Sequence, residues 1–324
     1  MIRPPHPLHP SLLGETLSTS EALRRGVSAD RLRRADIHHP FHGVVILGAR
    51  PQSTADRAWA LAQRMPDDSW FSHSTAAELR GLPLPRSHEN GVLHVTVPRN
   101  TRALRGAGVA GHQRDIAPPA FESLFVAASS GERVPLRVAT VGATLLTASS
   151  QLDHADLVAL IDAARCRDDD GTRRDIARML ERSARRAGST ALRRAAAQSR
   201  AGVRSRPESH LRLLVAAAGL PEPLVAPGVA TPEGVLHPDL AWPQFKVLVE
   251  YEGDEHRTNA RTFAFDIARF DTFVDADWSA VRCTSRDLYR RPRRVLETLA
   301  RRLRARGWRP ARPPRLGIPP IAMP

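Results

Sequence analysis

Lysine is almost absent from this sequence: Lys246 is one of 48 basic residues, and arginine supplies all the others. Acidic residues number only 34, which leaves a formal net charge of +14. A chain with so large a positive excess usually meets a polyanion, and nucleic acid is the leading candidate. The alternative is an arginine-rich surface that is simply solvated.

Cysteine is also scarce, since the chain has only Cys166 and Cys283 and no CxxC pair. This scarcity argues against a disulfide scaffold and against a thiolate zinc site, and it fits a reducing cytoplasm. Long apolar runs are missing as well. The N-terminal stretch MIRPPHPLHP has prolines where a signal peptide needs an apolar run, and residues 138–152 are too short and too polar to span a bilayer. We therefore expect a cytoplasmic protein without a membrane partner.

The length of 324 residues and a hydrophobic content of 42% allow more than one packed domain. Changes in composition and pattern divide the chain into a helical N-terminal segment, a mixed middle, a helical connector, an α/β segment and a proline-rich tail. The predicted boundaries are 1–52, 53–150, 151–204, 205–308 and 309–324.

The N-terminal segment has the pattern of two short helices followed by a strand. Residues 18–34 supply the helices, with Gly26 at the turn and Ser28 as a cap, and residues 41–48 supply the strand. This is the outline of a small winged helix-turn-helix, whose second helix enters the major groove. Arg31, Arg33 and Arg34 would then face phosphates. The alternative is a small helical subdomain that only packs.

The middle of the chain shows secondary structure without a chemical motif. A helix is predicted from a cap at Ser72 or Ser74 to Arg80, with Gly81 as its stop. Residues 93–98 alternate like a strand, and residues 153–200 read as mainly helical.

From residue 205 the pattern becomes more regular. Ser205 and Glu208 frame a helix that ends at Gly219. Three strands follow, in PLVAPGVA, VLHPDLAW and FKVLVEY, and then a helix, a strand in WSAVRCT and a last helix with leucines inward and arginines outward. The predicted order is therefore helix, three strands, helix, strand.

Two acidic residues of this region are expected to lie opposite each other. If residues 243–246 form a hairpin loop, Trp242 faces Val247, and Asp239 then faces Glu250 across neighbouring strands. Two ionised carboxylates there repel each other, so a hard cation such as Mg²⁺ or Mn²⁺ would stabilise the pair. Glu252 shares the face of Glu250. A pair of edge positions that face water is the alternative.

Other candidates have simpler explanations beside the functional ones. Glu208 fits a capping box as well as a site residue. His256 could act as a general acid or base, or lie in an exposed loop. Arg269 is three residues from Asp266 on a predicted helix, which favours a local ion pair over a phosphate contact. Arg282 is a candidate for phosphate contact.

The pieces ESHLRLL, HPDLAWP, VLVEYEGDEH, DIARF and WSAVRCTSRDL resemble the domain-of-unknown-function family 559. That family is related to the very-short-patch-repair endonucleases of the PD-(D/E)XK nuclease superfamily. The resemblance covers about residues 205–305. It implies that Asp239 and Glu250 are catalytic metal ligands and that Glu208 is the helix glutamate. Glu252 stands where the wider superfamily has lysine, and His256 resembles a histidine of the very-short-patch-repair branch.

The first two hundred residues resemble proteins with an AbiEi-type antitoxin region, on the helix-turn-helix, HPFHGVVIL, SHSTAAELRGLPLP and LHVTVP. This resemblance implies DNA binding or transcriptional autoregulation, and a toxin-like protein partner.

We thus predict a multidomain α+β chain with an N-terminal winged helix-turn-helix and a restriction-endonuclease-like αβββαβ core. The expected function is metal-dependent hydrolysis of nucleic-acid phosphodiesters. A DNA-binding regulator of antitoxin type that has lost catalysis is the alternative. The expected site residues are Glu208, Asp239, Glu250, Glu252 and His256, with Arg31, Arg33, Arg34, Arg269 and Arg282 on nucleic acid.

Overall fold

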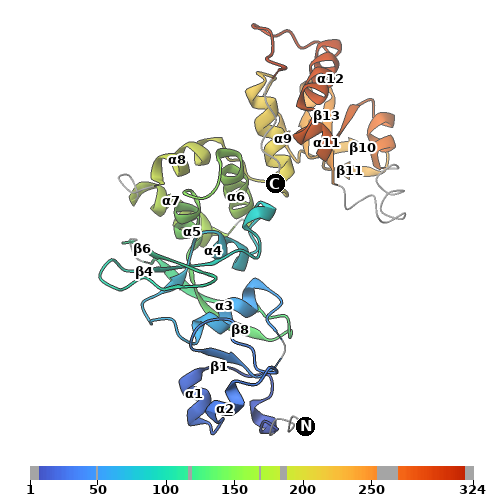
Figure 1. Ribbon diagram of the computed structural model, residues 1–324. Coiled ribbons are helices and arrows are strands. Elements are labelled where there is room, and N and C mark those ends of the chain that lie inside the picture. Colours follow the sequence, from blue (N-terminus) through green and yellow to red (C-terminus); the bar gives the residue numbers. More distant parts are fainter. Residues whose placement is uncertain are drawn as a thin grey trace. The chain divides into compact units, whose positions relative to one another are not determined.

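The computed structural model describes residues 7–48, 50–115, 119–167, 169–182, 188–253 and 269–317. The chain forms two compact units, which contain the elements drawn in Figure 1. The first comprises Met1–Gln151 and Arg174–Thr190, and the second comprises Leu152–Arg173 and Ala191–Pro324. Both contain helices and strands, so the expected mixed α+β class is confirmed at this level. Among the described residues, no helix combines the length and apolar content that crossing a bilayer requires.

The first unit begins with two short helices and a two-stranded antiparallel sheet. Ser18 and Ser28 cap the helices, because their hydroxyl oxygens accept the backbone N–H of Glu21 and Arg31, each at 3.2 Å. Gly26 makes the turn with φ of +88°, a conformation that favours glycine. The helix boundaries therefore lie where the sequence predicts them. The elements are η1 (Pro10–Leu12), β1 (Thr16–Ser18), α1 (Thr19–Arg24), α2 (Ala29–Leu32) and β2 (Val44–Ile46).

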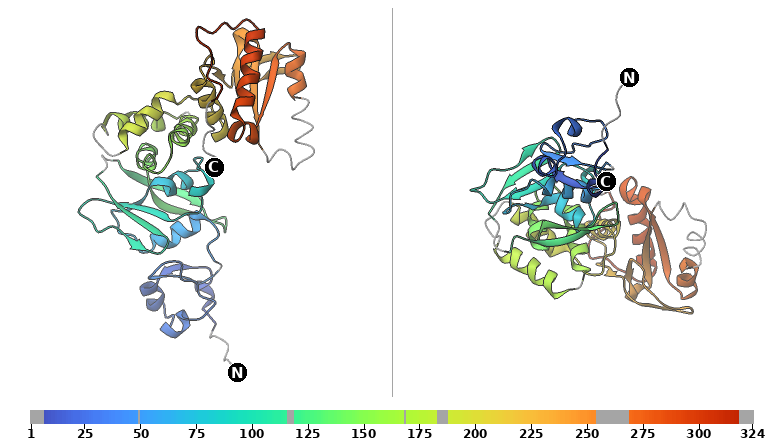
Figure 2. Two further views of the ribbon diagram at one scale, coloured as in Figure 1. Left: turned by 45° about the horizontal axis from the view of Figure 1, so that its top comes forward. Right: turned by 90° about the horizontal axis from the view of Figure 1, so that it is seen from below.

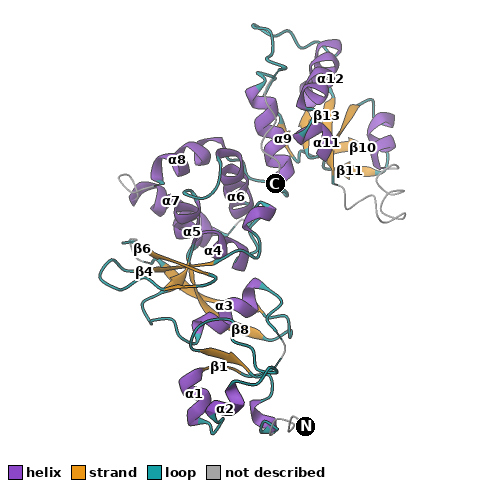
Figure 3. Ribbon diagram, in the orientation of Figure 1, coloured by secondary structure: helices purple, strands orange, loops and turns teal. Residues whose placement is uncertain are grey.

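The first unit continues with a six-stranded mixed sheet in the order β5-β6-β4-β3-β8-β7. Helices pack against this sheet (Figure 3). The predicted strand at 93–98 is confirmed as β4, and the predicted helix before Gly81 is confirmed as α4. The strands are β3 (Trp70–Phe71), β4 (Leu93–Val97), β5 (Arg105–Gly106), β6 (Val109–Gln113), β7 (Phe121–Ala127) and β8 (Arg133–Ala139). The helices are α3 (Thr54–Ala62), α4 (His73–Leu79), η2 (Arg86–His88) and α5 (Val141–Ala148).

The second unit is built on a four-stranded sheet in the order β14-β13-β12-β9, with a separate β10–β11 hairpin. Within it β12 and β13 are antiparallel, whereas β13 and β14 are parallel. The strands are β9 (Leu224–Val225), β10 (Val229–Thr231), β11 (Gly234–Leu236), β12 (Leu240–Trp242), β13 (Val247–Glu252) and β14 (Ser279–Thr284). The helices are α6 (His154–Arg165), α9 (Arg206–Ala217), η3 (Pro243–Phe245), α11 (Ser285–Tyr289) and α12 (Pro292–Ala305). The division between the units runs through α7 (Asp170–Arg182) and α8 (Ser189–Gln198).

The four-stranded sheet, which Figure 2 draws from two further sides, has an apolar core on each face, as strand alternation requires. The first face packs against α9 and α12. In α12 the leucines Leu296, Leu299 and Leu303 are fully buried, as predicted. The strand residues of this face are Leu240, Trp242, Val247 and Val249. The opposite face packs Ala241 and Leu248 against Phe273, which belongs to a helical segment at 269–275.

Two of the predicted strands are each divided in the structure. PLVAPGVA contains β9 and β10, and VLHPDLAW contains β11 and β12. Pro227 and Pro238 lie at the two breaks, and proline cannot donate to a strand ladder. The helix α11 was not predicted either. The sequence predicts Asp239 inside a strand. Because of the break at Pro238, however, β12 begins at Leu240, and Asp239 lies one residue before it.

Candidate functional site

The strand register brings Asp239 and Glu250 to one end of the β12–β13 pair. Trp242 is paired with Val247, as predicted, and Leu240 is paired with Val249. One further step in the same register sets Asp239 across from Glu250. Glu250 alternates with Val249 along β13 and therefore belongs to the sheet face opposite α9 and α12.

Asp239 is a carboxylate in an unfavourable environment. Its Oδ2 accepts the backbone N–H of Tyr251 at 2.7 Å. The pKa of Asp239 is raised to about 7, chiefly by burial, then by the charge of Glu208 and to a lesser extent by that of Glu250, whereas the Tyr251 hydrogen bond and Arg269 oppose the increase. Negative charge at this point is therefore only partly balanced by the protein itself.

Glu208 reaches this region from the first turn of α9. Ser205 is the N-cap, and its Oγ accepts the backbone N–H of Glu208 at 3.4 Å. The returning bond of the expected capping box is different, because Glu208 Oε2 accepts the backbone N–H of Arg204 at 2.9 Å. Glu208 is only 8% exposed. A buried carboxylate at this helix end therefore adds its charge to that of Asp239.

Arg269 pairs with Glu250 rather than lying open to a nucleic acid. Its Nε and Nη2 donate to Glu250 Oε1 at 3.2 and 2.8 Å, and Nη2 also donates to the carbonyl oxygen of His237 at 2.7 Å. The predicted local partner, Asp266, lies outside the described residues. Arg269 thus fixes one oxygen of Glu250. Among the described residues, no hydrogen bond or ion pair joins Arg269 to Asp239.

Arg282 and Glu252 form a second pair beside the first. Glu250 and Arg282 are register partners in the parallel β13–β14 ladder. The Arg282 Nε lies 3.1 Å from Glu252 Oε1, and its guanidinium lies 4.2 Å from the ring centroid of Phe270. Glu252 is therefore partly neutralised by an arginine on the next strand.

The other predicted site residues are distributed differently. His256 lies outside the described residues. In the first unit Arg31 pairs with Asp36 at 2.6 Å and its side chain is only 10% exposed. Arg33 is exposed and pairs with Asp30, and Arg34 is exposed. Of the three arginines expected to face phosphates, Arg33 and Arg34 are accessible.

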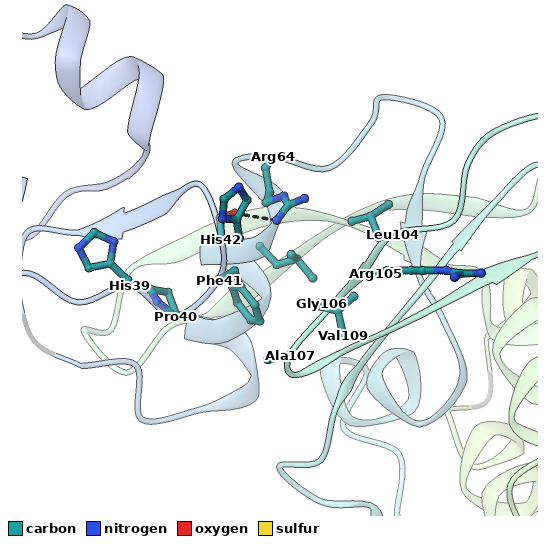
Figure 4. Close-up of a pocket in the computed structure, with 11 residues that line it drawn as sticks. His39, Pro40, Phe41, His42, Arg64, Leu104, Arg105, Gly106, Ala107 and Val109 are labelled. Carbon is teal, nitrogen blue, oxygen red and sulfur yellow. Dashed lines mark hydrogen bonds between the residues drawn. The ribbon is translucent and has the colours of Figure 1, made fainter. Parts of the chain in front are cut away.

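A pocket of about 200 Å³ lies in the first unit, and none of the predicted site residues lines it (Figure 4). Its wall includes Phe41, Leu104 and Arg105, and Arg64 Nη1 donates to the carbonyl oxygen of His42 at 2.6 Å. The guanidinium of Arg64 is therefore already engaged by the protein backbone at the edge of the pocket. The pocket contains none of the acidic residues that the sequence singled out.

Two features of the structure were missed by the sequence reading. One is the pairing of Arg269 with Glu250, which no local spacing signals because 19 residues separate them. The other is a cluster of His73, His94 and His112 in the first unit. Its members lie far apart in sequence, and only the strand pairing shows that they meet.

Comparison with known proteins adds no relative: no protein-family model matches the chain, and no curated protein matches it either.

Proposed function

We propose that the second unit hydrolyses the phosphodiester bonds of nucleic acid, DNA in particular, with a divalent metal held at Asp239. The observation that carries this proposal is the placement of Asp239 across from Glu250 and near the buried Glu208, where burial and these two charges raise the pKa of Asp239. Excess negative charge inside a protein costs free energy, and a bound dication relieves it. The cost of this charge favours a site that binds a cation over a purely structural group of carboxylates.

The donor set fits Mg²⁺ or Mn²⁺. Both are hard cations that prefer carboxylate oxygens, and Asp239, Glu250 and Glu208 offer only such atoms. When bound, the metal would polarise a phosphate oxygen and lower the pKa of a water molecule. Glu252 is a weaker candidate ligand, because Arg282 already holds one of its oxygens.

The chain's own groups position the proposed ligands. The Tyr251 N–H fixes Oδ2 of Asp239, and Arg269 fixes Oε1 of Glu250.

Exposed arginines on α12 supply positive charge that suits a phosphate backbone. They are Arg293, Arg294, Arg301, Arg302 and Arg304. His256 is the proposed acceptor for the proton of the attacking water.

A cleavage assay tests this proposal. Supercoiled plasmid incubated with the full chain and Mg²⁺ or Mn²⁺ should be nicked, and EDTA should stop the reaction. Glu250→Gln should lower the rate by roughly two orders of magnitude, because a neutral amide is a poor ligand for a hard cation. Glu233→Gln is the matched control, since Glu233 is exposed in the β10–β11 turn. Equal rates for the two variants would contradict the assignment.

The second candidate is a DNA-binding regulator without catalysis, in which residues 1–52 act as a winged helix-turn-helix and a toxin-like protein is the partner. The specific observation in its favour is the pair of arginine contacts, Arg269 on Glu250 and Arg282 on Glu252. Guanidinium groups can act as permanent counterions and make a metal unnecessary.

Arg269→Gln separates the two candidates. In the nuclease, wild-type protein binds Mg²⁺, and the variant binds it more tightly because one positive charge has left the site. In the regulator, wild-type protein binds no Mg²⁺, and binding appears only in the variant. Isothermal titration at low salt measures both affinities. Arg293→Gln is the control, because Arg293 pairs with Glu297 on the exposed face of α12.

A further inference from the structure

Three histidines of the first unit come together from separate elements. His73 begins α4, His94 lies in β4 and His112 lies in β6. In the parallel β4–β6 ladder His112 is the partner of Thr96, two residues from His94, so both rings share one face of the sheet. One ring nitrogen of each histidine lies within 4.8 Å of the corresponding atoms of the other two.

The rings are ordered by contacts with one another. His94 Nδ1 lies 2.9 Å from His112 Nε2, and the two rings are inclined by 20°. The His73 ring stacks on that of His112, with centroids 3.9 Å apart. His73 is only 1% exposed. Buried imidazole nitrogens need partners: His94 and His112 supply one contact to each other, and Gln151 Nε2 lies 2.9 Å from His94 Nε2.

His73 has a strained backbone. Its φ of +55° lies in the left-handed region, which costs a non-glycine residue roughly 1–3 kcal/mol. The backbone N–H of His73 donates to Thr147 Oγ1 at 3.0 Å, and this bond holds the conformation. Strain of this kind is concentrated at functional sites, because ordinary packing does not require it.

The residue at the N-cap of α4 serves the ring rather than the helix. Ser72 makes no side-chain cap bond. Its Oγ lies 2.8 Å from Nδ1 of His73 and accepts the hydroxyl of Thr96 at 2.7 Å. In metal sites, a contact from a neighbouring polar group to one ring nitrogen orients a histidine ligand. Here Ser72 contacts Nδ1 of His73, which leaves Nε2 for a metal.

We propose that His73, His94 and His112 bind one Zn²⁺ ion through three imidazole nitrogens, with the fourth position open to water or a substrate. Imidazole suits zinc, and three protein ligands with one open position are typical of catalytic zinc sites. Burial, more than the neighbouring rings, lowers the pKa of both His73 and His94.

Only small movements are needed to admit the ion. Two nitrogens that bind one tetrahedral zinc at ~2.0–2.1 Å lie about 3.3 Å apart, so the 2.9 Å separation of His94 and His112 must widen slightly. The His73 ring, which stacks on that of His112, must also tilt so that its Nε2 points at the ion while Nδ1 keeps its contact with Ser72. Arg114 is a nearby cation: burial is the main cause that lowers the pKa of His73 and of His112, and the charge of Arg114 contributes to both. The same charge opposes a dication.

Metal binding is measured on the full chain after dialysis against EDTA. Added Co²⁺ should give the visible spectrum of a four-coordinate ion at one equivalent, and Zn²⁺ should displace it. His112→Asn should weaken Zn²⁺ binding at least ~10-fold. Because a histidine variant can also disturb folding, Arg114→Met provides an independent test: it keeps all three ligands and should tighten Zn²⁺ binding.

Two controls separate this site from the acidic one. Asp239→Asn removes a carboxylate of the other unit and should leave the stoichiometry and affinity unchanged, whatever its effect on nucleic-acid cleavage. His154→Asn, in α6, changes a histidine outside the cluster and should also have no effect. An octahedral cobalt spectrum, or equal Zn²⁺ affinity in wild type, His112→Asn and Arg114→Met, would overturn the proposal and leave a neutral stacked histidine core.

Discussion

Asp239→Asn is expected to abolish metal-dependent cleavage and, at the same time, to stabilise the metal-free second unit. Loss of a ligand that helps to hold the metal should remove several kcal/mol of transition-state stabilisation, or roughly a thousandfold in rate. The amide oxygen of asparagine can still accept the Tyr251 N–H, which lies 2.7 Å from Oδ2 in the wild type. The change therefore removes the charge and preserves the hydrogen bond.

The gain in stability depends on pH in a defined direction. The pKa of Asp239 is raised from 3.8 to about 7 in the folded chain. Folded protein thus holds this proton more tightly than unfolded protein does, and the contribution of the proton to stability is complete below pH 3.8 and is lost as pH rises through about 7. At about 1.4 kcal/mol for each pKa unit, the charged group destabilises the fold by a few kcal/mol at pH 8.

Calorimetric unfolding in EDTA measures this effect. At pH 8 Asp239→Asn should exceed wild type in the free energy of unfolding by about 1–3 kcal/mol, and the difference should shrink towards pH 4. Added Mg²⁺ should stabilise wild type but not the variant. Asp275→Asn is the control, because Asp275 is exposed in the same unit. A less stable variant at pH 8 would mean that Arg269 already balances the carboxylate, and the cation site would lose its electrostatic support.

The sequence predicts the local elements of the second unit well, because their signals are local. Ser205 and Gly219 bound α9, and the register of Trp242 with Val247 follows from a four-residue connection. The leucines of α12 are buried because they recur at helical spacing. Periodicity and capping depend only on neighbours in the chain, so they can be read without a structure.

The charge partners could not be predicted in the same way. Arg269 meets Glu250 because a helical segment crosses the sheet face, and Arg282 meets Glu252 because β14 runs parallel to β13. Each contact depends on tertiary placement. The histidine cluster was missed for the same reason, since the parallel pairing of β4 and β6 is a non-local feature.

The largest loss of stability is expected from Asp162→Ala, in the buried interface of α6 and α9. Asp162 is fully buried. Its carboxylate accepts the hydroxyl of Ser209 at 2.7 Å, Nη2 of Arg212 at 2.8 Å and the backbone N–H of Arg200 at 2.6 Å. Burial raises the pKa of this group, and the contact with Arg212 opposes the increase. These contacts connect α6 to the helix that carries Glu208.

Alanine at position 162 would leave Arg212 as a buried charge without its carboxylate, since the Arg212 side chain is only 4% exposed. Removal of one partner of a buried ion pair costs about 3–5 kcal/mol, because the remaining charge has left water without compensation. In a unit of this size that loss lowers the midpoint of thermal unfolding by roughly 10 °C. Differential scanning calorimetry and urea titration measure both quantities.

Two further variants show whether the buried charge is the cause. Asp170→Ala removes an exposed pair with Arg173 and should cost no more than about 0.5 kcal/mol. The double variant Asp162→Ala, Arg212→Met removes both charges and should recover part of the lost stability, because no buried ion is left unpaired. If the double variant is less stable than Asp162→Ala alone, the loss arises from packing and from the bonds to Ser209 and Arg200. In that case the unpaired guanidinium contributes little, and the connection between α6 and the helix that carries Glu208 depends on neutral hydrogen bonds.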